Sequence, residues 1–211
     1  MGREKYLREI ENLFKKSPVV DFSSIERIIK NKNKVKQYAK QLVRNLIKKG
    51  KIKRLTKGFY TCYDEASLGV FCFKPSYLGL QNALSFHNLW EQETIPVVIT
   101  ARKIRQGIRK TLGNGNILIR RIDKKYMFGF DYCKEGDFYY PYSDIEKTLI
   151  DMLYFKEHMD LEVLAEIKRK IDKKKLEKYL KKYPQRFKEK VEKALMGRKD
   201  LKCRGLNSLV R

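Results

Sequence analysis

The stretch that decides the fold is 33-NKVKQYAKQLVRNLIKKGKIKRLTKG-58, a basic helical pattern followed by a basic hairpin pattern. Its apolar residues recur at helical spacing and predict one buried stripe. Gly50 is expected to end the helix, because glycine is common at helix C-termini. Residues 51–55 and 59–63 predict two strands around a short turn. This order of helix and hairpin is the one that a winged helix-turn-helix requires. The predicted stripe comprises Val35, Ala39, Leu42, Val43, Leu46 and Ile47.

The polar face of this helix carries the residue types that read base edges. Glutamine can pair bidentately with adenine and arginine with guanine, so Gln37, Gln41 and Arg44 are expected to contact bases. Lys48 of the helix and Lys53, Arg54 and Lys57 of the hairpin are expected to make most of the phosphate contacts. The predicted DNA-binding residues are Lys34, Lys36, Gln37, Lys40, Gln41, Arg44, Lys48, Lys53, Arg54 and Lys57.

Two shorter helices are expected before this stretch. Residues 4–16 have one apolar face, and Ser17-Pro18 ends the pattern because proline disfavours helix in the residue before it. A second helix opens near Ser23, which we expect to be its N-cap, with Glu26 as capping-box partner. Helix, helix, turn, helix and hairpin thus follow one another within residues 1–63.

Charge is distributed unevenly along the 211 residues, whose formal net charge is +24. Residues 1–63 hold 18 Lys and Arg against 5 Asp and Glu, and residues 156–211 hold 19 against 9. Between them, residues 64–155 are nearly neutral, with 12 against 11. Two basic ends attract polyanions, so nucleic acid is the expected partner.

Several classes of protein are disfavoured by the sequence. It contains no apolar run long enough for a membrane span and no signal-peptide pattern at its start, so we expect no membrane partner and a cytoplasmic location. The cysteines, at 62, 72, 133 and 203, form no Cys-x-x-Cys pair, so no metal site is expected. We also expect no cofactor and no catalytic residue, and hence no enzyme.

The middle region, residues 64–155, predicts a compact mixed α/β domain. Strands are expected at 70–73, 95–100, 116–122, 126–130 and 138–141, and a helix across 77–89. A capping box from Ser143 to Glu146 predicts a second helix to about residue 155. Residues 156–211 then predict a Lys-rich helical region. The expected fold class is therefore α+β, with domains at 1–63, 64–155 and 156–211.

Three features of the middle region resemble functional motifs but have plainer interpretations. His87 lies on an apolar helix face and is expected to be a core histidine with one hydrogen-bond partner. Asp123-Lys124-Lys125 is expected to be a turn, because no second acidic residue is spaced for a nuclease motif. Residues 113–115 are too short for a phosphate-binding loop.

Four segments together resemble the AbiEi family of transcriptional regulators, over about residues 5–155. They are 50-GKIKRLTKGFY-60, 75-PSYLGLQNALSFH-87, 96-PVVITAR-102 and 144-DIEKTLIDMLY-154. The family's wing has the form G-x-I-x-R-L-x-x-G-x-Y, and its other segments include P-S-Y-x-x-L-x-x-A-L-x-x-H, a strand followed by T-x-R, and E-K-A-L-L-D-L-L-Y. All four occur here in the expected order.

The resemblance implies an antitoxin of a type IV toxin–antitoxin pair, whose N-terminal winged helix represses its own operon. It also implies inverted repeats as operator, and a functional link to a nucleotidyltransferase-like toxin without a stable complex. A monomer or a homodimer is compatible with two half-sites. The antitoxin role is carried to no named residue of this chain.

An RNA-binding protein or a metal-dependent nuclease acting through the middle domain is the alternative. RNA readers present aromatic side chains on a sheet for base stacking. The candidates for such a surface are Phe128, Phe130, Tyr132, Tyr139 and Tyr140.

Overall fold

The computed structural model describes residues 6–29, 35–92, 94–112 and 115–206, with the side chains of residue 35 and of residues 197–206 left aside. The chain mixes helices and strands, which confirms the α+β class. It divides into two compact units. Unit 1 comprises Met1–Ser76 and Ile95–Arg121, and unit 2 comprises Tyr77–Thr94 and Ile122–Arg211. The three consecutive domains expected from the sequence stay a prediction.

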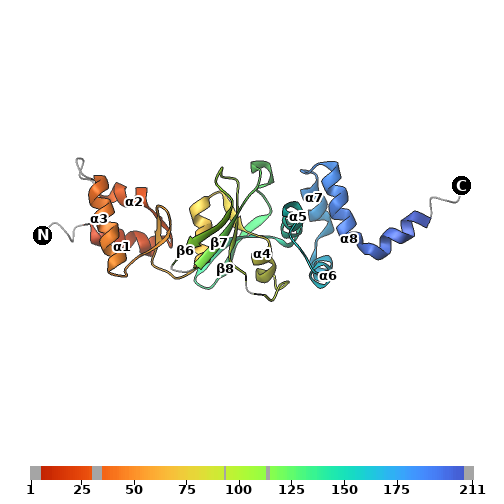
Figure 1. The fold of residues 1–211 in the computed structure, drawn as a ribbon, viewed down its shortest axis with the longest axis horizontal. Coiled ribbons are helices and arrows are strands. Elements are labelled where there is room, and N and C mark those ends of the chain that lie inside the picture. The colour runs from red at the N-terminus through yellow and green to blue at the C-terminus, as the bar shows by residue number, and fades with distance from the viewer. Residues whose placement is uncertain (1–5, 30–34, 93, 113–114, 207–211) are drawn as a thin grey trace. The chain divides into compact units, whose positions relative to one another are not determined.

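The first part of unit 1 is a group of helices with a small sheet (Figure 1). The sheet is antiparallel, in the order β1-β3-β2. The elements are α1 (Leu7–Lys16), β1 (Val20–Asp21), α2 (Phe22–Ile28), α3 (Val35–Lys48), β2 (Lys53–Thr56) and β3 (Phe59–Thr61).

One apolar core joins these elements. Ile10 of α1 and Ile25 of α2 are fully buried with Ala39 of α3, and Ile52 extends the core to the start of β2. The N-cap expected for α2 is wrong. Asp21, and not Ser23, is the N-cap, and its carboxylate accepts a hydrogen bond of 2.6 Å from Ser24 N. Val20 and Asp21 pair with β3 immediately before the helix, so α2 begins at Phe22.

The remainder of unit 1 consists of a 3-10 helix and three strands. These elements are η1 (Ala66–Phe73), β5 (Val97–Thr100), β6 (Gly107–Thr111) and β7 (Gly115–Arg121). The strand expected at 70–73 is part of η1, because this buried segment packs closely against β7. A Cβ added to Gly69 would lie 3.0 Å from Ile117 Cδ1. Strand β6 is not predicted by the sequence. It pairs antiparallel with β7 from Gly107 to Thr111.

A second sheet has six strands in the order β6-β7-β5-β4-β9-β8 and is mixed, since β5 and β7 are parallel whereas β8 and β9 are antiparallel. Its other strands are β4 (Ser76–Leu78), β8 (Phe130–Glu135) and β9 (Phe138–Ser143).

Unit 2 contains α4 (Gln81–Phe86), η2 (Lys124–Tyr126), α5 (Ile145–Phe155), α6 (Leu161–Lys170), α7 (Lys173–Leu180) and α8 (Gln185–Leu206). Figure 1 shows α5 grouped with α6, α7 and the first part of α8. The helix expected across 77–89 is shorter, because Leu78 pairs with Tyr142 of β9 and Leu80 has a φ of 56°. Helix α4 therefore begins only at Gln81.

Two further expectations in unit 2 are corrected. The strand expected at 126–130 begins at Phe130, because the preceding residues form η2 and Tyr126 stacks on Tyr183 at 4.1 Å. The N-cap of α5 is Asp144, whose carboxylate accepts from Lys147 N at 2.7 Å. Ser143, the expected cap, is instead the last residue of β9.

Unit 2 also buries an ionic pair inside its core. Lys147 and Asp151, one turn apart on α5, are fully buried and joined by an ion pair. Tyr77 donates to the other oxygen of Asp151 at 2.6 Å, and the Lys147 ammonium lies 3.3 Å from the Tyr183 hydroxyl. Burial lowers the pKa of Lys147 and raises that of Asp151, and the attraction between the two opposes both shifts.

Candidate nucleic-acid interface

Helix α3 turns an apolar face to the core of unit 1. Ala39, Val43 and Leu46 are buried, with at most 4% of each exposed, and Leu42 packs against the same core. Ile47, also assigned to this stripe, is 39% exposed and lies at its margin. The predicted apolar stripe is therefore confirmed for its central residues. The helix cannot rotate without exposing that apolar face.

The opposite face of α3 is exposed and contains no acidic residue. Gln41 lies two residues from the buried Ala39, which is about 200° around the helix axis. Lys34 lies outside the described residues. The predicted helix residues that the structure does describe are all exposed, namely Lys36, Gln37, Lys40, Gln41, Arg44 and Lys48.

Gly50 ends the helix by a mechanism that glycine favours. Its φ is +67°, its N–H donates to Ile47 O at 2.9 Å, and the next N–H, of Lys51, donates to Leu46 O at 3.0 Å. This pair of bonds is the Schellman arrangement, which satisfies carbonyls that the helix leaves free. The chain then turns directly into β2, so the hairpin follows α3 with a fixed geometry.

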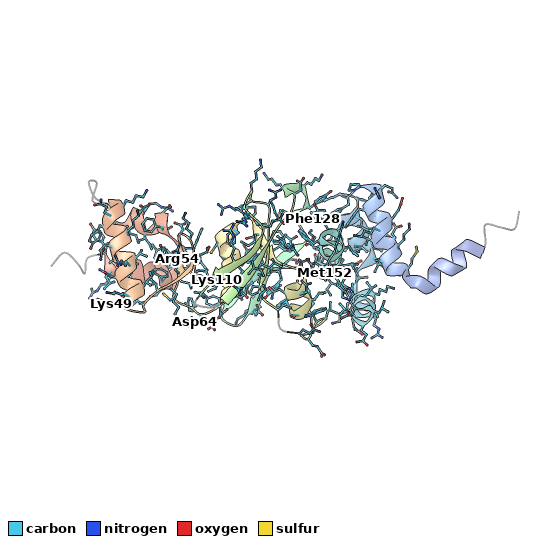
Figure 2. All side chains as sticks on the ribbon, viewed as in Figure 1. Lys49, Arg54, Asp64, Lys110, Phe128 and Met152 are labelled. Carbon is cyan, nitrogen blue, oxygen red and sulfur yellow. The ribbon has the colours of Figure 1, made fainter. Side chains whose placement is uncertain are left out.

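The hairpin of β2 and β3 presents the other predicted residues. Arg54 and Lys57 are exposed, and Arg54, which Figure 2 labels, pairs with Tyr60 in the antiparallel register. Gly58 has a φ of +82°, a backbone conformation that glycine adopts at no steric cost and that lets the chain turn between β2 and β3. Lys53 differs from its neighbours, because its ammonium is paired with the carboxylate of Asp64. Its positive charge is therefore already compensated.

A second basic strand lies beside the hairpin within unit 1. Strands β2 and β6 are in contact, and the buried hydroxyl of Thr111 donates to Leu55 O at 2.6 Å. Lys110, next to Thr111, is exposed, and Figure 2 labels it with Arg54. Residues 95–121 contain seven Lys and Arg and no acidic residue. The basic character of these residues is hidden in the sequence, because acidic residues elsewhere in 64–155 balance their charge.

The structure also brings out a residue that the pattern did not single out. Asn45 is exposed on α3, one turn after Gln41, and its Oδ1 accepts a hydrogen bond of 3.1 Å from Gln41 Nε2. The spacing of four residues was available as a signal, since such pairs face each other on a helix. The predicted set includes Gln41 as a base-reading residue but does not include Asn45, its hydrogen-bond partner.

The five aromatic residues proposed for base stacking lie in different environments. Tyr132 and Tyr139 are 60% and 59% exposed, whereas Tyr140 is buried. Phe130 stacks on Tyr77 with ring centroids 4.9 Å apart. Phe128 packs edge-on against a tyrosine of α7 at 5.0 Å. Two of the five are thus open to a ligand.

Two other candidate features of the middle region take part in hydrogen bonds within the chain. His87 Nε2 lies 2.7 Å from Ser143 O, which supplies the hydrogen-bond partner expected of it, although the residue is half-buried and not part of the fully buried core. Asp123 caps η2 by accepting from Lys125 N at 3.2 Å. Within the described residues, no three or more His, Cys, Asp and Glu side chains gather as metal ligands would. In the same part of the chain, no helix combines the length and low polarity of a membrane span.

Comparison with known proteins supports the fold alone. No protein-family model matches the chain, and no curated protein matches it. Among solved structures, it is similar to the crystal structure of the RV2827C protein from Mycobacterium tuberculosis, with a TM-score of 0.54 and 11% sequence identity. The match covers 89% of this chain and 75% of that one. At this identity the similarity concerns architecture and assigns no activity.

Proposed function

We propose that the chain is a non-enzymatic, sequence-specific double-stranded DNA-binding protein that represses transcription, and that α1 to β3 form a winged helix-turn-helix. The observation that carries the proposal is the exposed, acid-free face of α3 beside a basic hairpin. The element order and the β1-β3-β2 sheet support it. The charge supports it too, because unit 1 holds 26 Lys and Arg against 7 Asp and Glu.

In this proposal α3 lies in the major groove. A helix about 10–12 Å across fits a groove about 12 Å wide. Gln37, Gln41 and Arg44 contact base edges, and Arg54 and Lys57 of the hairpin contact phosphates. Lys48 contributes a phosphate contact from the end of the helix, and Lys34, Lys36 and Lys40 add to the attraction of the duplex. Lys53 contributes less, since Asp64 compensates its charge.

The wider biological role rests on the resemblance to the AbiEi family. That resemblance favours an antitoxin that autoregulates its operon in the cytoplasm, bound to inverted repeats as a homodimer or as two monomers. A nucleotidyltransferase-like toxin is the functional partner it implies. An adjacent gene for such a toxin, and rescue of cell growth from it by this protein, are the observations that test this role.

The test of DNA binding uses two variants with different expected signatures. Arg44→Ala is expected to cost about 1–3 kcal/mol on a binding site selected from a randomised duplex pool, and little on random duplex. Lys57→Ala is expected to weaken both duplexes alike and to lower the slope of log K against log salt by about one unit. Equal losses for both variants on both duplexes would contradict the assigned roles.

RNA binding is the second candidate, favoured by one observation. Tyr132 and Tyr139 lie on the same face of the β8–β9 hairpin, because the register pairs residue 132 with 141 and residue 134 with 139. Exposed aromatics of this kind stack on unpaired bases. Tighter binding to structured RNA than to duplex DNA, lost in Tyr132→Ala, would favour this candidate. Strand cleavage on addition of magnesium would favour the nuclease alternative.

A further inference from the structure

The hydrogen bond between Gln41 and Asn45 has a consequence for base recognition. A glutamine amide has two N–H donors and one carbonyl acceptor. Nε2 gives one N–H to Asn45 Oδ1 at 3.1 Å, and when that is the N–H pointing away from Oε1, the other N–H remains beside Oε1. An acceptor next to a donor is the edge that pairs with adenine, which offers N6–H and N7 in the major groove. A bond made through that N–H leaves the adenine-reading edge of Gln41 free while it holds the side chain.

Asn45 lies on the flank of α3, one turn after Gln41. It lines a hollow of about 300 Å³ between α1 and α3, together with Leu7 and Leu42. Gln41 also borders this hollow, but lies nearly opposite the buried stripe of α3. An amide at position 45 thus restrains Gln41 through a hydrogen bond along the flank of the helix.

The chemistry of residue 45 also suits a phosphate-rich partner. Helix α3 contains four Lys and Arg and no acidic residue. An aspartate at position 45 would accept the same hydrogen bond, but its negative charge would repel phosphates. Asparagine supplies the acceptor without the charge, so two variants of this residue can separate positioning from electrostatics.

We infer that Asn45 is a positioning residue that orders the Gln41 carboxamide for adenine. The inference rests on the proposed DNA-binding function. A free glutamine must be immobilised on binding, which costs about 0.5–1.5 kcal/mol, and the bond to Asn45 provides that ordering beforehand.

The experiment measures adenine discrimination, which is the ratio of affinities for a selected site and for the same site with one A·T pair changed. Gln41→Ala identifies the pair that Gln41 reads, by abolishing discrimination there. Asn45→Ala is expected to lower discrimination at that pair roughly three- to ten-fold, which corresponds to the cost of immobilising one side chain. Its affinity for random duplex should stay unchanged. Alanine favours helix, and circular dichroism checks that α3 stays folded.

Asn45→Asp is the variant that separates the two effects. It should keep the discrimination, because the carboxylate still accepts from Gln41, and it should weaken binding to every duplex. Full discrimination in Asn45→Ala, or its loss in Asn45→Asp, would overturn the inference, as would an adenine preference that survives Gln41→Ala. The proposed function fails separately, if the wild-type protein does not bind duplex or if Arg44→Ala and Lys57→Ala bind like wild type.

Discussion

The two units differ in their net charge and in whether a charged pair lies buried in the core. Unit 1 holds 26 Lys and Arg against 7 acidic residues, a net charge of +19, whereas unit 2 holds 23 against 18, a net of +5. In unit 1 the cations of α3 and of the hairpin tip are exposed. In unit 2 a lysine and an aspartate are fully buried together in the core. Unpaired exposed charge attracts a partner, while paired buried charge restricts how the core can pack. The next variants test this contrast.

The largest expected effect is on the stability of unit 2. Asp151→Ala leaves the Lys147 ammonium buried without its anion and removes the acceptor of the Tyr77 hydroxyl. Breaking a buried pair in this way costs about 3–5 kcal/mol, which urea unfolding monitored by circular dichroism would measure. The double variant Lys147→Met with Asp151→Leu should be closer to wild type, because it leaves no unpaired charge. A double variant as unstable as Asp151→Ala would show that the pair itself is stabilising.

A smaller loss is expected at Gly129, which lies against the same buried lysine. Its φ is +70°, and a Cβ would lie 2.9 Å from both Lys147 Cβ and Tyr179 Cε2. Gly129→Ala should therefore cost about 1–3 kcal/mol of unfolding free energy through overpacking, in addition to backbone strain. Gly136→Ala is the matched control, since its φ is +57° and no atom lies within 4 Å of the added Cβ. Similar losses in the two variants would attribute the effect to the backbone alone.

Removing one lysine from each unit tests the charge contrast directly. Lys110 on β6 and Lys181 after α7 are both exposed. Lys110→Ala should lower the salt slope of duplex binding by about one unit if the basic surface of unit 1 extends beyond the hairpin. Lys181→Ala should leave the slope unchanged. A fall of the same size in both variants would mean that net charge matters more than its position.

The smallest expected effect concerns an exposed ion pair of unit 1. Lys51 Nζ lies 2.6 Å from Glu11 Oε1, and this hydrogen bond lowers the pKa of Glu11. A carboxyl group with a lowered pKa adds stability above its unfolded value of about 4.3, and that stability is lost as the pH falls through the folded value. Lys51→Ala should cost less than about 1 kcal/mol at pH 7, because the pair is solvent-exposed. Thermal unfolding should show the difference vanish in acid.

The sequence by itself determined the amphipathic helix α3, its end at Gly50 and the hairpin after it, because the apolar spacing and the turn glycines act over a few residues. Local signals misassigned segments whose conformation depends on distant partners. Residues 70–73 form a 3-10 helix because they pack on β7, and residues 76–78 form a strand because they pair with β9.

Only the tertiary structure decided which charged side chains are available to bind a partner. Lys53 and Arg54 are adjacent and both basic, yet Asp64 compensates the first. Lys147 looks like any surface lysine in sequence but is buried with Asp151. The basic strand β6 joins unit 1 although about 50 residues separate it from the hairpin in sequence. Charge acts through space, so its effect depends on partners that packing brings together and that periodicity along the chain does not specify.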